Sequence, residues 1–336
     1  MAVGIKEVAV VARVSAATVS RVLAGRAVDP AMRQRVLAAV DSTGYRPNLA
    51  ARRLRSRRSN TIGLIVADIR NPFFTAVSRT VEDIAYARGQ RVILCNTDED
   101  PAREAMYLQL MQEERASGVI LAPSRQAAEL TEGFTTDFPL VLIDRALPGV
   151  ARDCVLLDNE AMSAALVDHL YERGHRRIAG LFGASTTGLQ RRAGYEQRAA
   201  VLAMDARAVS VAHRPGEVET AVTSVLRVAD PPTALIASNG VMLMAVMQAV
   251  QSLGLSVPDD VALAGFDNQD WMAFIGRGLS VIEQPVEEIG RVAMAMLLDR
   301  LDHPQAAARR VVLSGRLILH GAGPQPQRSE APVAAV

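Results

Sequence analysis

The sequence predicts a small all-α module at the N-terminus, followed by a large α/β body with two groups of parallel strands. Three observations support this fold class. Residues 1–59 carry 12 Lys and Arg against three Asp and Glu, a net charge of +9, whereas the other 277 residues carry 25 against 33, a net charge of −8. The first sixty residues show the helical period of apolar positions. Beyond residue 60, short continuous apolar runs alternate with helical patterns, which is typical of strands buried on both faces.

The composition limits the class of protein. The chain has 336 residues, of which 49% are hydrophobic, enough for a large core and two or three domains. Two cysteines, Cys95 and Cys154, exclude a disulfide framework and favour a reducing compartment. The sequence shows no signal peptide and no apolar run near the roughly 20 residues that span a bilayer. We therefore expect a soluble cytoplasmic protein without a membrane partner.

Three short helices are predicted in residues 1–47. The first covers about residues 5–12. The Ser15 hydroxyl caps the second, and Asp29 caps the third, which begins at Pro30 and stops at Gly44. A stripe of apolar residues on each helix is expected to form the small core. The residues expected in this core from the second and third helices are Val19, Val22, Leu23, Val36, Leu37 and Val40.

This arrangement predicts a helix-turn-helix module, because two helices are joined by a three-to-four-residue turn and a third completes the core. The second helix of such a module enters the DNA major groove, where its first residues touch base edges. Small side chains at Ala16 and Ala17 let the backbone approach the groove. Arg21 can reach guanine O6 and N7 with two hydrogen bonds. Taken alone, Arg21 is explained equally well as a solvent-facing side chain.

The basic segment at residues 48–60 requires a separate explanation. A helix of about two turns that begins at Asn48 is too short to be stable alone, and its arginines repel one another. Beside phosphates the same charges become favourable, so the segment is expected to fold when it binds DNA. The alternative is an unfolded basic linker.

Eight apolar runs in the body predict eight strands, in two groups that separate near residue 157. These runs are residues 61–69, 91–97, 118–123, 140–145, 177–183, 209–214, 234–238 and 261–267. In parallel sheets ligands bind beyond the carboxyl ends of the strands, so we expect a cleft between the two groups. The candidate residues for this site are Asp68, Asn71, Phe73, Phe74, Arg145, Ser185, Thr187, Arg191, Arg214, Asn239, Asp267 and Trp271.

The chemistry of these candidates leaves several ligands open. Asp267 and Asn239 suit sugar hydroxyls, and Trp271 suits the face of a pyranose ring. The arginines suit a carboxylate or a phosphate. Each residue also has a purely structural explanation, since Asp267 could cap a helix and Trp271 could belong to the core.

The stretches IKEVAVVARVSAATVSRVLAG, GYRPNLAARRLRS and TIGLIVADIRNPFF resemble, in this order, the LacI/GalR (lactose repressor) family of bacterial transcription regulators. The resemblance extends to about Gly321. It implies that Ala16, Ala17 and Arg21 read bases. The phosphate-contacting positions that it implies are Ser15, Thr18, Ser20 and Asn48. The sequence departs from the family pattern at Gly4, where a capping Thr is usual, at Arg13, where the turn usually has Gly, and at Gly240, where many relatives have Asp.

The resemblance also assigns residues 48–60 to a hinge helix that pairs with its mate in the minor groove. Leu54 is its apolar wedge, which kinks the duplex. Ala51 and Arg55 are further DNA-contacting candidates in the same segment. A single hinge helix lacks its packing partner, so this assignment implies a homodimer.

For the body, the resemblance implies a two-lobed, periplasmic-binding-protein-like effector domain over residues 61–322, with three crossings between lobes. The N-terminal lobe is expected at about 61–160 and 288–317, the C-terminal lobe at about 161–287 and 318–322, and a disordered tail at 323–336. Arg191, Asn239 and Asp267 match family positions that hydrogen-bond a sugar or purine, and Phe73 and Phe74 match positions that cover it. The stretches FDNQDWMAFIGRGLSVIEQP and GRLILHGAG are similar to relatives that sense sugar acids such as gluconate or 2-ketogluconate.

The expected function is therefore a dimeric, cytoplasmic and nucleoid-associated transcriptional repressor of sugar or sugar-acid metabolism. Its partners are palindromic double-stranded operator DNA and a sugar, sugar acid or sugar phosphate as effector, with no cofactor and no metal.

An enzyme fits less well, because GLFGASTTG lacks the Lys-Ser/Thr of a P-loop and no G-x-S-x-G is present. An exported solute-binding protein would have no use for the +9 module. The tail lacks a leucine heptad, which favours a dimer over a tetramer. Whether the effector releases DNA or promotes binding stays open.

Overall fold

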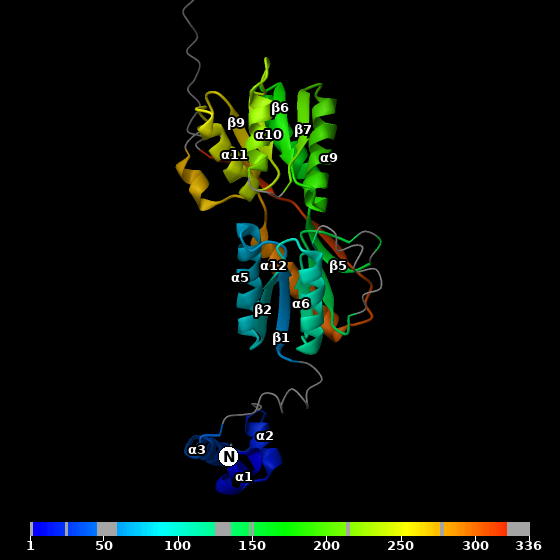
Figure 1. The fold of residues 1–336 in the computed structure, drawn as a ribbon. Coiled ribbons are helices and arrows are strands. Elements are labelled where there is room, and N and C mark those ends of the chain that lie inside the picture. Colours follow the sequence, from blue (N-terminus) through cyan, green and yellow to red (C-terminus); the bar gives the residue numbers. More distant parts are fainter. Residues whose placement is uncertain are drawn as a thin grey trace, which may run out of the picture. The chain divides into compact units, whose positions relative to one another are not determined.

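The computed structural model describes residues 3–23, 26–45, 59–124, 136–147, 149, 151–212, 216–275 and 279–320. The chain divides into two compact units, Met1–Ser59 and Asn60–Val336 (Figure 1). No helix in the described part of the chain combines the length and apolar composition that a bilayer crossing needs.

In its described residues, the first unit is a bundle of three helices. They are α1 (Ile5–Ala12), α2 (Ala16–Leu23) and α3 (Pro30–Thr43). The predicted caps are confirmed: Ser15 Oγ accepts from the Thr18 N–H at 3.1 Å, and Asp29 accepts from the first turn of α3, which ends at Gly44. At the start of α1, Gly4 offers no capping side chain, but its N–H donates to Glu7 Oε2 at 2.7 Å.

The core of this bundle differs from the prediction at one helix. Its buried residues are Val8, Ala9, Ala12, Val19, Val22, Val36 and Ala39. Leu37 was expected inside but is 46% exposed, whereas Leu23 and Val40 are half-buried and pack against this core as predicted. The buried stripe of α3 passes through Val36 and Ala39, three residues apart, so Leu37 points about 100° away from it.

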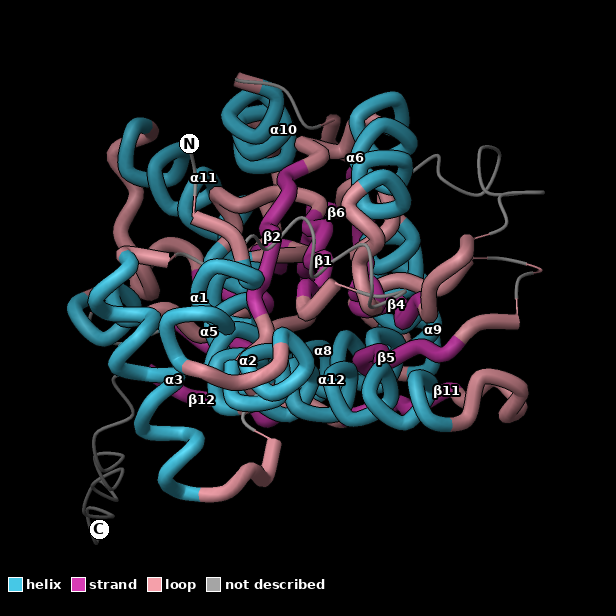
Figure 2. Tube along the Cα trace, turned by 90° about the horizontal axis from the view of Figure 1, so that it is seen from below, coloured by secondary structure: helices cyan, strands magenta, loops and turns pink. Residues whose placement is uncertain are grey.

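The second unit contains two six-stranded sheets in its described residues, one in each lobe. The sheet of the N-terminal lobe has the order β11-β5-β4-β3-β1-β2 and is parallel throughout. Figure 2 shows β2, β1, β4, β5 and β11 following one another across this lobe. Its elements are β1 (Thr61–Val66), α5 (Pro72–Ala87), β2 (Arg91–Asn96), α6 (Pro101–Glu113), β3 (Gly118–Leu121), β4 (Leu140–Ile143), β5 (Asp153–Leu157), α12 (Val286–Asp302) and β11 (Arg310–Leu313).

The sheet of the C-terminal lobe has the order β12-β10-β9-β8-β6-β7, and only β12 runs antiparallel to its described neighbour. The elements of this lobe are α8 (Asn159–Glu172), β6 (Arg177–Phe182), α9 (Thr186–Val201), β7 (Asp205–Ser210), α10 (Glu217–Leu226), β8 (Ala234–Ala237), α11 (Gly240–Ser252), β9 (Ala262–Phe266), the 3₁₀ helix η1 (Asp270–Phe274), β10 (Leu279–Glu283) and β12 (Arg316–His320).

Helices cover both faces of each sheet, which explains the continuous apolar strands. In the N-terminal lobe, α5 and α12 pack on one face and α6 on the other. In the C-terminal lobe, α10 and α11 pack on one face and α8 and α9 on the other. The last pair approaches so closely that a Cβ at Gly194 would lie 2.2 Å from the Glu160 carbonyl oxygen. The prediction of α/β lobes with parallel sheets is confirmed.

The strand predictions need two corrections. The run at 209–214 is not a strand of its own, because β7 ends at Ser210. Four described strands, β5, β10, β11 and β12, were not predicted. Within the described residues the chain changes sheet between β5 and α8, between β10 and α12, and between β11 and β12. The first and the last of these crossings are neighbours, since the Asp158 N–H donates to the Leu313 carbonyl at 2.9 Å.

Candidate functional site

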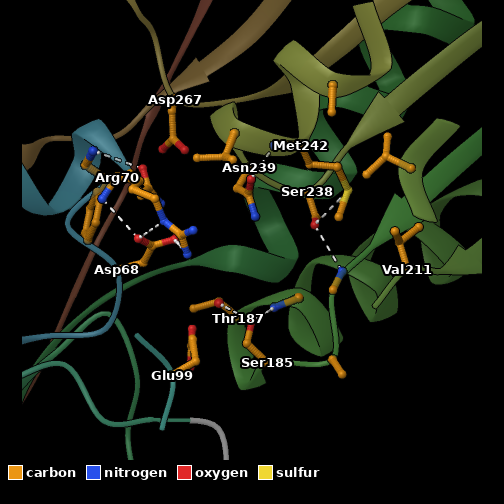
Figure 3. Close-up of a pocket in the computed structure, with 18 of the residues that line it drawn as sticks. Asp68, Arg70, Glu99, Ser185, Thr187, Val211, Ser238, Asn239, Met242 and Asp267 are labelled. Carbon is orange, nitrogen blue, oxygen red and sulfur yellow. Dashed lines mark hydrogen bonds and ion pairs between the residues drawn. The ribbon is translucent and has the colours of Figure 1, made fainter. Parts of the chain in front are cut away.

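The carboxyl ends of the strands in both lobes surround one pocket of about 890 Å³. In each sheet the first strand, β1 or β6, lies between the two that follow it in sequence, so the connections on either side leave a crevice at its end. Figure 3 shows Asp68, Arg70 and Glu99 of the N-terminal lobe and Ser185, Ser238 and Asn239 of the C-terminal lobe around this space.

Most of the predicted ligand-contacting residues line this pocket. They are Asp68, Asn71, Phe73, Phe74, Arg145, Ser185, Thr187, Arg191, Asn239 and Asp267. Arg214 lies outside the described residues. Trp271 is not among the lining residues: it belongs to η1, packs beside the core of the C-terminal lobe, and donates from Nε1 to Gln269 Oε1 at 2.5 Å.

Asp68 follows β1 and is held by a neighbouring arginine. Arg70 donates from Nε to Asp68 Oδ1 at 2.9 Å and from Nη2 to Asp98 Oδ1 at 2.8 Å. The hydrogen bond and the charge of Asp68 raise the pKa of Arg70. This ion pair places a carboxylate and a guanidinium together at the rim, so the rim presents both acceptors and donors.

Arg145 follows β4 and is 7% exposed. Its Nη1 and Nη2 donate to the two carboxylate oxygens of Glu99 at 2.8 and 2.7 Å, and Nε lies 3.1 Å from Asp144 Oδ2. Burial alone would lower the pKa of Arg145, but Asp144 and Glu99 outweigh it and raise that pKa. Burial raises the pKa of Asp144. The positive charges of Arg145 and Arg191 lower this pKa in part, but the effect of burial is larger, so the pKa stays raised. Buried charges persist only when paired in this way.

Arg191 on α9 lines the pocket from the C-terminal lobe and is 4% exposed. Its Nε donates to Asn159 Oδ1 at 2.7 Å, and Nη1 donates to the Ser238 carbonyl at 2.5 Å. The guanidinium also stacks on the Phe266 ring, 3.8 Å from its centroid. Burial lowers the pKa of Arg191, because the low-dielectric surroundings disfavour the charged form.

Asp267 follows β9 and takes a left-handed backbone conformation, φ 71°. Its carboxylate accepts from the Gly240 N–H at 2.8 Å and from Gln284 Nε2 at 2.6 Å. The first bond places the negative charge at the N-terminus of α11, where the helix dipole favours it. A Cβ at Gly240 would lie 3.0 Å from Asp267 Cβ and 2.5 Å from Gln269 Nε2, so the glycine permits this approach.

Several lining residues also have structural roles. Asn71, Ser185 and Asn239 each cap a helix, accepting from the N–H of Phe73, Gly188 and Met242 respectively. Because Asn239 uses its oxygen for the cap, its amide N–H groups are the part directed to the pocket (Figure 3). Phe73 packs edge-to-face on Phe74, and both belong to the core of the N-terminal lobe.

The sequence reasoning missed several lining residues. They are Arg70, Asp98, Glu99, Asp144, Ser238, Met242 and Gln284, among others. Glu99 follows the predicted strand at 91–97, so the same rule that selected Asp68 would have found it. Gln284 follows β10, which was not predicted. In the described part of the chain, no three His, Cys, Asp or Glu side chains gather as metal ligands.

The N-terminal bundle carries the predicted DNA-contacting residues on α2 and the turn before it. Ser15, Ala17 and Arg21 are exposed, whereas Thr18 and Ser20 are half-buried. Ala16 is also half-buried, and it packs against the small core. The predicted residues Asn48, Ala51, Leu54 and Arg55 and the tail 323–336 lie outside the described residues.

A helix-turn-helix bundle joined to a two-lobed α/β body with a polar pocket defines a ligand-responsive DNA-binding protein. Comparison with known families agrees with this class. Residues 4–48 match the profile "Bacterial regulatory proteins, lacI family", and residues 167–321 match "Periplasmic binding protein-like domain". The chain belongs to the lacI family of bacterial regulatory proteins and is a DNA-binding regulator of transcription.

Individual relatives match over nearly the whole chain. The HTH-type transcriptional regulator PtxS of Pseudomonas plecoglossicida is 34% identical over 96% of both chains. The HTH-type transcriptional repressor PurR of Photobacterium profundum is 30% identical over 94% of this chain and 97% of its own. A crystal structure of the Lac repressor dimer bound to operator and the anti-inducer ONPF shares the fold, with a TM-score of 0.83 and 24% identity over 95% of this chain and 98% of that chain.

Proposed function

We propose that this protein is a homodimeric repressor, active at the nucleoid in the bacterial cytoplasm, whose affinity for a palindromic operator is set by a sugar-class effector. The observation that carries the proposal is the combination of two sites in one chain. The exposed face of α2 and the turn before it presents Ala17, Arg21 and the capping Ser15. The body offers a pocket that mixes carboxylate, amide, hydroxyl and guanidinium groups.

For DNA binding, Arg21 reads a base and the shorter side chains of α2 contact phosphates or allow close approach. Arg21 is exposed and borders Ser20 and Ala17 on the same face. A homodimer places two such helices one helical turn apart on a palindrome. Selection from random duplex DNA by the full-length protein tests this. We expect an enriched palindrome bound at least about a thousandfold more tightly than random sequence. Equal affinity for both would contradict the proposal.

For the effector, alternating donors and acceptors suit a ligand with several hydroxyl groups. Asp267 and Asp68 accept, whereas Arg191 and the Asn239 amide donate. Sugars, sugar acids and sugar phosphates all offer such groups. A thermal-shift panel of these three classes tests the proposal, because a ligand at about 100 times its Kd stabilises the folded state by about 2.7 kcal/mol.

A matched pair of variants makes this panel specific to the pocket. Asp267→Asn removes a charge that faces the ligand, so the shift is expected to shrink. Asp168→Asn changes a carboxylate that pairs with Arg198 and does not line the pocket, so the shift is expected to persist. A panel in which no compound raises the unfolding temperature would contradict the sugar-class assignment.

A further inference from the structure

Two amide side chains stand at crossings between the lobes, and each holds a charged residue of the pocket. Asn159 is the first residue of α8, directly after the crossing from β5, and is 3% exposed. Gln284 follows β10, directly before the crossing to α12, and is 6% exposed. Their partners, Arg191 and Asp267, are the lining residues that carry opposite charges on the C-terminal side.

Asn159 connects Arg191 to the last strand before the crossing. Its Oδ1 accepts from Arg191 Nε at 2.7 Å. Its Nδ2 donates to Gln190 Oε1 at 3.0 Å and to the carbonyl of Leu157, the last residue of β5, at 3.3 Å. A shift of the Arg191 guanidinium towards a ligand therefore pulls on a side chain that is also bonded to the sheet of the other lobe.

Gln284 makes the corresponding connection for Asp267. Its Nε2 donates to Asp267 Oδ1 at 2.6 Å, and its backbone carbonyl accepts from the Val286 N–H, at the start of α12, at 2.9 Å. Since α12 packs on the sheet of the N-terminal lobe, Gln284 lies between a pocket carboxylate and that lobe. A buried amide that loses its partner is costly, so both residues favour one arrangement of pocket and crossing together.

We propose that Asn159 and Gln284 are positioning residues that transmit occupation of the pocket to the crossings between the lobes, and thus to operator affinity. The inference rests on the proposed function. Asn159 does not line the pocket, whereas Gln284 does, so for Gln284 the proposal concerns the response of operator Kd at saturating compound and not the affinity for the compound. It assigns the coupling to two hydrogen bonds, Asn159 to Arg191 and Gln284 to Asp267, rather than to the crossings as a whole.

The test compares operator binding with and without a saturating concentration of the panel compound that gives the largest thermal shift. The operator is the selected palindrome, and calorimetry fixes saturation for each variant. In the wild type we expect operator Kd to change by about 5- to 150-fold. Asn159→Leu and Gln284→Met remove the hydrogen bonds at similar size, and each is expected to bring this ratio to within about twofold of one at a compound concentration that calorimetry shows to be saturating for that variant.

Two further variants separate positioning from a general loss of structure. Asn159→Asp keeps an acceptor for Arg191 and is expected to restore the coupling. Asn268→Leu removes an amide that is hydrogen-bonded to Glu283 Oε1, beside the same crossing, and to His320 Nε2, each at 2.8 Å. It leaves the hydrogen bonds of Arg191 to Asn159 and of Asp267 to Gln284 in place, so it is expected to keep the wild-type ratio. If one variant does not fold, the other still tests its own hydrogen bond.

The possible results separate the positioning role of Asn159 and Gln284 from the proposed function of the protein. If both Asn159→Leu and Gln284→Met bind the compound and retain the wild-type ratio, the inference is wrong and the proposed function stands. If Asn268→Leu loses coupling to the same extent, the crossing as a whole is responsible and the inference is also wrong. If no panel compound binds the wild type, the proposed effector class fails, and the inference fails with it.

Discussion

Arg13 ends α1 in the left-handed backbone region, φ 51°, which favours glycine. Its N–H returns to the carbonyls of Ala9 and Val10, so the conformation is part of the tight turn that leads into α2. The side chain is exposed and gains no packing that would offset the conformational cost. At this residue the turn geometry therefore prevails over the local preference of arginine.

Replacing Arg13 by glycine is expected to stabilise the N-terminal bundle by about 1 kcal/mol, because an L-residue loses about that much in this region. Hydrogen exchange of the α1 amides in the full chain measures the free energy of opening. Arg13→Ala is the control, since alanine has the same Cβ and should give no gain. Equal protection in the two variants would show that the turn carries no strain.

Arg21 is the exposed residue of α2 to which we assign base reading. Arg21→Ala is expected to relax sequence preference at one position in each half-site, at a cost of about 1–3 kcal/mol for the preferred base. Binding of a library with single substitutions in the selected palindrome measures this. Uniform weakening on all sequences would assign Arg21 to a phosphate instead.

At the scale of elements, a buried ion network joins β5, α12 and β11. The Asp153 side chain on β5 is 1% exposed and accepts from Arg300 Nη2 at 2.8 Å and Arg309 Nη2 at 3.1 Å. Burial alone would raise the pKa of Asp153, but these hydrogen bonds outweigh it and lower that pKa. The network fixes β11, the edge strand that precedes the last crossing.

Asp153→Ala is expected to destabilise the body by about 3–5 kcal/mol, since it leaves Arg300, itself mostly buried, without its partner. Asp168→Ala removes a carboxylate of similar chemistry whose pair with Arg198 is more than one third exposed, so a change of less than about 1 kcal/mol is expected. Urea denaturation measures both. Similar losses in the two variants would contradict the role of burial.

His169 links α8 to β10 through a 2.8 Å hydrogen bond between Nε2 and Ser280 Oγ. Burial, then the charge of Arg173, lowers its pKa below the ordinary value, and His175 is lowered for the same reasons. Both rings thus bind a proton less readily in the folded state than in the unfolded chain, which binds protons there below about pH 6.5. Their contribution to stability is therefore present above that pH and is lost as the pH falls.

The free energy of unfolding is expected to fall less between about pH 7.5 and about pH 5.5 in His169→Gln than in the wild type, because one of the two lowered pKa values is removed. Urea titrations at the two pH values provide the comparison. His175→Gln should show the same trend independently. An unchanged pH slope in both variants would mean that neither ring is kept neutral by the fold.

At the scale of the whole molecule, continuous apolar runs were the strongest sequence signal. They predicted the strands at the centre of each sheet, such as β1 and β8, whose residues are all buried. Among the strands that escaped, β10 is a buried run like the predicted ones, whereas the other three have a different pattern. β5 begins with the buried ion-paired Asp153, and β11 and β12 are edge strands with alternating or partial exposure. Their pairing depends on distant segments, which local periodicity does not contain.

The pocket was predictable to the extent that its residues follow predicted strands. Asp68, Arg145 and Asp267 lie at the carboxyl ends of such runs, and all three line the pocket. Gln284 was not predicted, because β10, the strand that it follows, was not predicted either. The hydrogen bond from Asn159 to Arg191 joins residues 32 positions apart, so no local pattern contains it. Trp271 was selected for its chemistry, but its position is set by packing of η1 against the C-terminal core.

One small molecule in the pocket of the body is expected to control the affinity of the N-terminal bundle for DNA. The most direct test measures two quantities with the full-length protein: operator Kd with and without saturating compound, and compound Kd with and without saturating operator. Because coupling is reciprocal, both are expected to change by the same factor, between about 5 and 150. An operator Kd that stays unchanged at saturating compound would contradict the account.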